Sequence, residues 1–174
     1  MIRPQRELPV VYLKPGEIHI AEHPTLIITV LGSCLAVTMF SRRTGHGAMC
    51  HGLLPKCKGE RSCCGGCLEK FRFVDCSIEQ MVKMFDKLKI KRRDIEVKVF
   101  GGSDMFSREI KIPGLVSIGR QNVQTAELVL QREGLAIAKM DVGGLQGRKI
   151  LFYTDTGDVL LKRLTKVNDP DIQW

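Results

Sequence analysis

Aromatic residues are few in this sequence, and long apolar runs are missing. Phe, Trp and Tyr make up 6% of the 174 residues, and no nucleic-acid recognition motif accompanies the net charge of +8. No stretch approaches the roughly 18 consecutive apolar residues that a membrane-spanning helix needs. The first residues, Met1 to Glu7, also lack the apolar segment of a signal peptide. These absences favour a cytoplasmic protein that neither inserts into a membrane nor binds nucleic acid.

The excess of basic residues has two interpretations. Lys and Arg number 27 against 19 Asp and Glu, and they occur in short, interrupted clusters. Such clusters favour a solvated face, and the alternative is attraction to an acidic protein partner. The glycine pairs at 101–102 and 143–144 do not predict a nucleotide site, because they match neither Gly-x-x-x-x-Gly-Lys nor Gly-x-Gly-x-x-Gly.

Strand patterns outnumber helical ones along the chain. Strands are predicted at residues 10–13, 18–21, 26–31, 34–40, 47–51, 95–99, 135–140, 150–153 and 159–164. One helix is predicted from Ser77, which forms a capping box with Gln80, and another over about 119–133, ending at Gly134. Because many strands fall in hairpins, we expect one α+β domain over residues 1–174, with mixed sheets and two main helices.

The sequence has seven cysteines, at positions 34, 50, 57, 63, 64, 67 and 76. Without a signal peptide, disulfides are not expected, and metal binding or catalysis is favoured. Cys64 and Cys67 have the spacing of half a zinc knuckle, and Cys57 and Cys63 would complete four thiolates. The alternatives are free thiols or an oxidation-dependent disulfide. Cys76 is predicted to precede the helix and to lie in the core.

Cys34 and His51 form a candidate catalytic pair. Each belongs to a strand pattern, and the polar segment between the two strands, 41–45, predicts a hairpin turn. If the hairpin is centred between Arg42 and Arg43, Cys34 lies opposite His51, with Cβ atoms about 4.5–5.5 Å apart. That distance suits an imidazole that removes a thiol proton before acyl transfer.

The same two residues also have a structural interpretation. Cysteine is among the most buried residue types and often acts as a small hydrophobe, and a lone strand histidine is often only hydrogen-bonded. A shift of one residue in the hairpin would place the two side chains on opposite faces. Pairing geometry alone therefore leaves both interpretations open.

Several segments together resemble the chemoreceptor glutamine deamidase family, CheD. They cover the chain in family order from about Ile18 to Leu164. The segments are Leu31–Val37, His51–Pro55, Val99–Phe106, Ile118–Asn122, Asp141–Ile150 and Thr154–Gly157. The resemblance implies a fold similar to the catalytic domains of cytotoxic necrotizing toxins, with mixed sheets flanked by helices.

The resemblance also implies a Cys-His-Thr site. Cys34 matches the nucleophile and His51 the base, and Thr29 is the nearest match to the third member. We expect the backbone N–H groups of the turn at Gly32, Ser33 and Cys34 to stabilise the oxyanion. No metal or organic cofactor is required for this chemistry. The cysteine-containing loop 57–67 departs from the family pattern, so zinc remains a separate possibility there.

The implied reaction is hydrolysis of glutamine side chains to glutamate in the cytoplasmic domains of methyl-accepting chemotaxis receptors. Receptor methyl-ester hydrolysis would follow the same route. One alternative function is a non-catalytic regulator that binds a CheC-type phosphatase. Another is a metal- or redox-responsive variant that uses the cysteines of the 57–67 loop.

Overall fold

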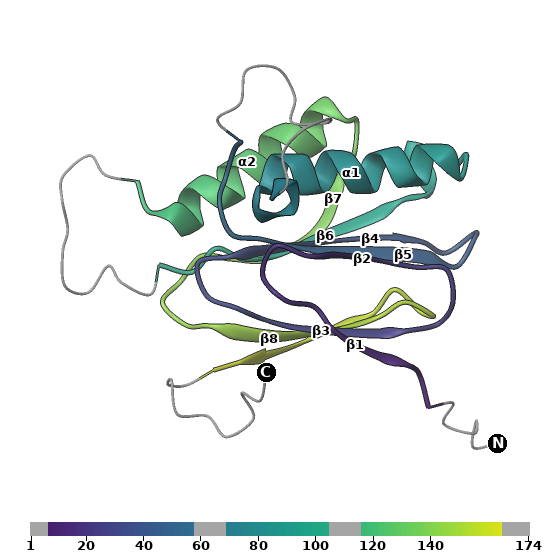
Figure 1. Cartoon of the computed structure of the whole chain (residues 1–174), viewed down its shortest axis with the longest axis horizontal. Coiled ribbons are helices and arrows are strands. Elements are labelled where there is room, and N and C mark those ends of the chain that lie inside the picture. Colours follow the sequence, from purple (N-terminus) through teal and green to yellow (C-terminus); the bar gives the residue numbers. More distant parts are fainter. Residues whose placement is uncertain (1–6, 58–68, 105–115, 165–174) are drawn as a thin grey trace.

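Two β-sheets are stacked in this computed structural model, and two helices cover one of them (Figure 1). The structure describes residues 7–57, 69–104 and 116–164. The strands are β1 (Val10–Tyr12), β2 (Ile18–Ala21), β3 (Leu26–Leu31), β4 (Leu35–Ser41), β5 (His46–Gly52), β6 (Glu96–Gly101), β7 (Ile137–Val142), β8 (Arg148–Tyr153) and β9 (Val159–Arg163). The helices are α1 (Val74–Lys87) and α2 (Ile118–Arg132), with short 3-10 turns at Lys70–Arg72 and Arg92–Asp94. The predicted α+β class is confirmed.

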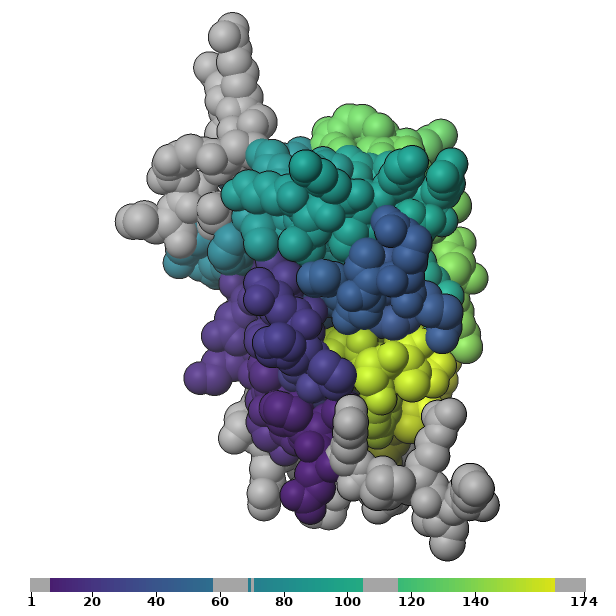
Figure 2. Space-filling view, turned by 90° about the vertical axis from the view of Figure 1, so that its right-hand side faces the viewer, coloured from purple at the N-terminus to yellow at the C-terminus, as the bar shows by residue number. Residues whose placement is uncertain are grey.

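Both sheets are mixed. One has the strand order β1-β3-β8-β9, and the other has the order β2-β5-β4-β6-β7. The pairs β1–β3 and β6–β7 are parallel, and the remaining pairs are antiparallel. The chain passes from the first sheet to the second through Gly32, Ser33 and Cys34, between β3 and β4. Figure 2 shows the layers from the side, with the segment that contains α1 (teal) above the β4–β5 hairpin (blue) and the β8–β9 hairpin (yellow) below it.

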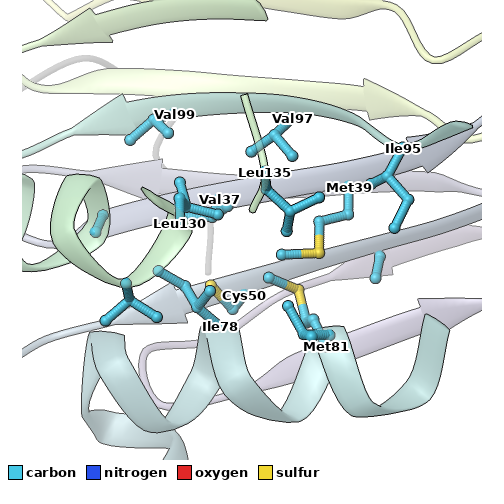
Figure 3. Close-up of a cluster of buried hydrophobic side chains, with 14 of the residues drawn as sticks. Val37, Met39, Cys50, Ile78, Met81, Ile95, Val97, Val99, Leu130 and Leu135 are labelled. Atoms are coloured by element: carbon cyan, nitrogen blue, oxygen red, sulfur yellow. The ribbon is translucent and has the colours of Figure 1, made fainter. Parts of the chain in front are cut away.

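One hydrophobic core lies between the five-stranded sheet and the helices (Figure 3). Side chains alternate between the two faces of a strand, so Val37 and Met39 of β4 and Cys50 of β5 point to the helices. There they meet Ile78 and Met81 of α1, and all five are at most 1% exposed. Burying an aliphatic side chain of this size contributes about 1.5–3 kcal/mol, which holds both helices on this face.

A second core fills the space between the two sheets. Its members from β4 and β5 include Ala36 and Met49, and its members from the other sheet include Ile27, Leu31 and Phe152. All five are fully buried. By strand alternation, His51 lies on the same face of β5 as Met49 and therefore points into the space between the sheets.

Two predictions around α1 were wrong. The helix begins at Val74, with Phe73 as its N-cap, so Ser77 lies inside the helix and forms no capping box. The buried Ser77 hydroxyl instead donates to the Phe71 carbonyl at 3.0 Å. Cys76 is consequently a helical, half-buried residue, whereas a core position before the helix was expected.

The second predicted helix agrees closely with α2. The helix starts at Ile118, where the Ser117 hydroxyl accepts a hydrogen bond from the Arg120 N–H at 3.4 Å. It stops before Gly134, which has a φ of +70°. A left-handed residue just past the last turn is the common way to end a helix. Within the described ranges, neither helix has the length and apolar run needed to cross a membrane.

Candidate active site

The β4–β5 hairpin is offset from its predicted register. Its loop runs from Arg42 to Gly45, and both Thr44 and Gly45 donate their N–H groups to the Ser41 carbonyl. Gly45 supplies the positive φ of +72° that closes this longer turn. Because the turn ends at Gly45, the first pair of the hairpin is Ser41 with His46. Counting back along both strands, His51 pairs with Ala36 of β4 and not with Cys34.

The register error does not separate the two side chains. Cys34 stands two positions before Ala36, so extending the strand alternation puts it on the same face as His51, in a diagonal relation. Cys34 also packs against the core between the sheets. The structure therefore brings the thiol and the imidazole to the same end of this space.

Thr29 joins this site from the other sheet. Its hydroxyl lies 2.8 Å from His51 Nδ1 and donates a hydrogen bond of 2.7 Å to the Leu13 carbonyl. A hydroxyl has a single hydrogen to donate. Because that hydrogen goes to Leu13, the Thr29 oxygen must accept from an N–H at His51 Nδ1. The network thus assigns the neutral tautomer in which Nε2 carries the lone pair.

His51 Nε2 is buried, and it has no hydrogen-bond partner among the described residues. The imidazole as a whole is 1% exposed. Burial lowers the pKa of His51 to about 4, although the Leu13 carbonyl and the Glu17 carboxylate oppose the shift. At neutral pH the ring is therefore an uncharged base with an unused acceptor.

Cys34 is half-buried in the connection between the sheets. Burial raises the pKa of its thiol, and the residue's own backbone N–H opposes the shift. The resting pair is accordingly a neutral thiol beside a neutral imidazole. A neutral pair of this kind suits general-base chemistry, in which attack by the thiol would be coupled to proton transfer to the imidazole.

A glycine-containing segment at the end of β6 holds the backbone around Cys34. Gly102 donates to the Cys34 carbonyl and Ser103 donates to the Gly32 carbonyl, each at 2.8 Å. Gly101 has a φ of +111°, and a Cβ on it would lie 2.3 Å from the Cys34 carbonyl oxygen. Only glycine fits this close approach of two backbones. The Gly101–Gly102–Ser103 segment therefore fixes the position of the loop that carries Cys34.

Two buried polar side chains at the site were not singled out from the sequence. Asn122 of α2 is fully buried and donates to the Ser33 and Leu53 carbonyls, both at 3.0 Å. Arg148 of β8 is 1% exposed and donates to the Gly101 carbonyl. Both residues lie in segments that carry the family resemblance, which was the available signal. Their partners are backbone carbonyls, and these leave no residue pattern to detect.

Arg148 also organises the neighbouring loop. Its guanidinium donates to the carbonyls of Asp141 and Gly143, at 3.0 and 2.6 Å, and faces the Asp141 carboxylate at 3.4 Å. Asp141 in turn pairs with Arg163 at 2.7 Å. Burial lowers the pKa of Arg148, and the Asp141 charge opposes that shift. The carboxylate at 141 thus stabilises a buried cation.

Of the four clustered cysteines, only Cys57 lies within the described residues. Cys57 is disulfide-bonded, which differs from the expectation of reduced cysteines. Cys63, Cys64 and Cys67 lie outside the described residues. Among residues 7–57, 69–104 and 116–164, no group of three metal-binding side chains comes together. Zinc binding at the four cysteines stays a prediction.

Fold and site together define an α+β protein with a cysteine, a histidine and a threonine gathered where two sheets meet. A family model described as CheD chemotactic sensory transduction matches residues 53–163. The chain belongs to the CheD family.

Similar proteins extend the match across nearly the whole chain. "Probable chemoreceptor glutamine deamidase CheD 2" of Geobacter sulfurreducens is 50% identical over 160 residues, which cover 92% of this chain and 93% of the relative. "Probable chemoreceptor glutamine deamidase CheD" of Maridesulfovibrio salexigens is 37% identical, over 93% of this chain and 96% of the relative. A solved Neisseria meningitidis structure from DUF152 covers 79% of this chain and 63% of its own, with a TM-score of 0.46 at 15% identity. That likeness bears on no functional point.

Proposed function

We propose that this protein hydrolyses specific glutamine side chains of chemotaxis receptors to glutamate. One observation carries the proposal: Thr29 holds His51 through Nδ1 at 2.8 Å and leaves Nε2 buried and unpartnered near the thiol. The names of the CheD relatives supply the substrate class. The similarity to cytotoxic necrotizing toxins remains part of this proposal.

The first half of the reaction forms a thioester. His51 Nε2 accepts the thiol proton as Cys34 Sγ bonds to the glutamine side-chain carbon. The carbonyl oxygen becomes an oxyanion, for which the N–H groups at Gly32, Ser33 and Cys34 are the donors in this proposal. When the carbon–nitrogen bond breaks, protonated His51 gives its proton to the departing ammonia.

The second half regenerates the enzyme. His51 removes a proton from water, and the resulting hydroxide attacks the thioester carbon. The carbon–sulfur bond then breaks, glutamate leaves, and the proton returns to the Cys34 sulfur. Thr29 keeps the imidazole in one tautomer throughout, which is the role of the third member in catalytic triads. No step needs a metal or an organic cofactor.

The test is mass spectrometry of a receptor cytoplasmic fragment incubated with the protein. Each conversion of glutamine to glutamate adds about 1 Da, the amide-to-acid change of this acyl transfer. Conversion should disappear with Cys34→Ala and persist with Cys76→Ala, because Cys76 is a half-buried residue of α1 that takes no part in the proposed chemistry. Conversion that survives Cys34→Ala would refute the proposed nucleophile.

We also propose a second reaction, a second partner and a cellular location, all of which the family resemblance implies. The same thioester route would hydrolyse receptor glutamyl methyl esters, with methanol in place of ammonia. A CheC-type phosphatase is the proposed second partner, and the cytoplasm is the proposed location.

A purely binding role has no need of the Thr29–His51 network beside a thiol, which favours catalysis. Zinc at the cysteine loop is tested by metal analysis of protein purified under reducing conditions.

A further inference from the structure

Asn122 connects the two halves of the candidate active site. Its side-chain amide nitrogen donates to Ser33, the residue before Cys34, and to Leu53, two residues after His51. The donor assignment is unambiguous because both partners are carbonyl oxygens. The amide oxygen is buried and has no partner among the described residues.

A glycine brings the helix close enough for this contact. Gly119 lies one turn before Asn122 on the same face of α2, and a Cβ on it would lie 2.6 Å from the Gly102 carbonyl oxygen. Gly102 in turn binds the Cys34 carbonyl. The first turns of α2 are therefore docked directly against the backbone that frames the nucleophile.

The contact with Ser33 sets the direction of the next N–H group. A trans peptide is planar, and its C=O and N–H bonds point in opposite directions. The described residues contain no cis peptide bond. Because Asn122 holds the Ser33 carbonyl toward α2, the N–H of Cys34 points away from the helix. Among the described residues, no carbonyl accepts a hydrogen bond from this N–H.

We propose that Asn122 is a positioning residue that aims the Cys34 N–H at the oxyanion formed during acyl transfer. The inference rests on the proposed thiol chemistry at Cys34. Asn122 touches neither substrate nor the reacting atoms, and it acts by locking the Ser33–Cys34 peptide plane. Losing this lock leaves the thiol and its base in place but misdirects the donor.

The test compares two reactions of the same thiol. Acylation of Cys34 by p-nitrophenyl acetate passes through an oxyanion, whereas alkylation by iodoacetamide does not. For each reaction, the rate measured with Cys34→Ala is subtracted, so that only modification of Cys34 is compared. In Asn122→Leu, which is close to asparagine in size and removes both donors without adding a titratable group, we expect acylation to fall roughly 10- to 100-fold, somewhat less than deletion of an oxyanion donor costs. Alkylation and its pH profile should stay within about twofold of wild type, since they need only the thiolate.

A role confined to folding would give a different result. Equal losses in the two reactions, or no loss in either, would overturn the inference. If Asn122→Leu does not fold, Asn122→Ser retains one donor and should show a smaller but selective loss of acylation. Gln121→Ala is the matched control, because the adjacent Gln121 amide donates to the Val116 carbonyl, outside the site.

The two proposals fail separately in these assays. Neither probe needs a receptor, so a selective loss of acylation without any receptor deamidation would refute the proposed function and leave the role of Asn122 intact. Receptor deamidation that depends on Cys34, combined with equal effects on both probes, would refute only the role of Asn122.

Discussion

The buried imidazole of His51 should make folding stability depend on pH. Burial lowers its pKa from 6.5 to about 4 in the folded chain. Below 6.5 the unfolded chain binds a proton that the folded chain does not, so the free energy of unfolding falls as the pH falls toward 4. A shift of this size corresponds to about 3 kcal/mol in full, of which about 2 kcal/mol is lost between about pH 7.5 and about pH 5.

Urea unfolding at these two pH values measures the effect. His19 is also buried enough for its pKa to be lowered, so the wild-type dependence contains a contribution from that residue. The informative quantity is therefore the difference between wild type and His51→Gln. This difference should shrink by about 2 kcal/mol on acidification, because the variant has no imidazole to protonate at this position.

A matched substitution tests whether the effect belongs to burial. His23→Gln changes an exposed histidine in the loop after β2 and should keep the wild-type dependence on pH. If wild type and His51→Gln lose the same stability between the two pH values, His51 is not a buried neutral base. The tautomer argument at Thr29 would then fail with it.

Three further predictions concern the surroundings of the nucleophile. Thr29→Val should lower the deamidation rate roughly tenfold or more. It should also lower the free energy of unfolding in urea by about 1–3 kcal/mol, because the Leu13 carbonyl loses the Thr29 hydroxyl as a donor. Thr29→Ser should be close to wild type in both measurements. Since burial raises the pKa of Cys34, its alkylation by iodoacetamide, followed by intact-mass spectrometry, should keep accelerating beyond about pH 9; a plateau at neutral pH would contradict this. Gly101→Ala should destabilise the fold by more than about 2 kcal/mol, because a Cβ would lie 2.3 Å from the Cys34 carbonyl. The control Gly134→Ala has the same sign of φ but no atom within 4 Å, so a cost of about 1 kcal/mol is expected; equal costs would contradict the steric argument.

The secondary structure was predictable where the apolar pattern was local. The predicted strands at 18–21 and 26–31 agree with β2 and β3 residue for residue. These segments carry their own periodicity, and turn residues bound them. The start of α1 was mispredicted because Ser77 and Gln80 match a capping box by sequence alone. Whether such a serine caps a helix depends on tertiary contacts, and here its hydroxyl reaches the Phe71 carbonyl instead.

In the β4–β5 hairpin, an error in the predicted centre of the turn changes which residue pairs with His51. The polar segment 41–45 identified the turn but not its centre, since Arg42, Arg43 and Thr44 have no strong positional preference in a turn. Gly45 decided the register through its positive φ. His51 pairs with Ala36 instead of Cys34, a displacement of two positions, and because this number is even both side chains remain on one face of the sheet. An odd displacement would have separated the thiol from its base.

The residues that frame the nucleophile were beyond this kind of prediction for a physical reason. A cysteine, a histidine and a threonine have side chains that react or bind with one another, so their residue types alone suggest a site. Asn122 and Arg148 bind backbone carbonyls instead, and every residue type offers the same carbonyl. Nothing in the composition of a strand or loop marks such a carbonyl as a partner. In the proposed mechanism the peptide between residues 33 and 34 carries the oxyanion donor, so the residue that fixes this peptide would contribute to catalysis without contacting the substrate.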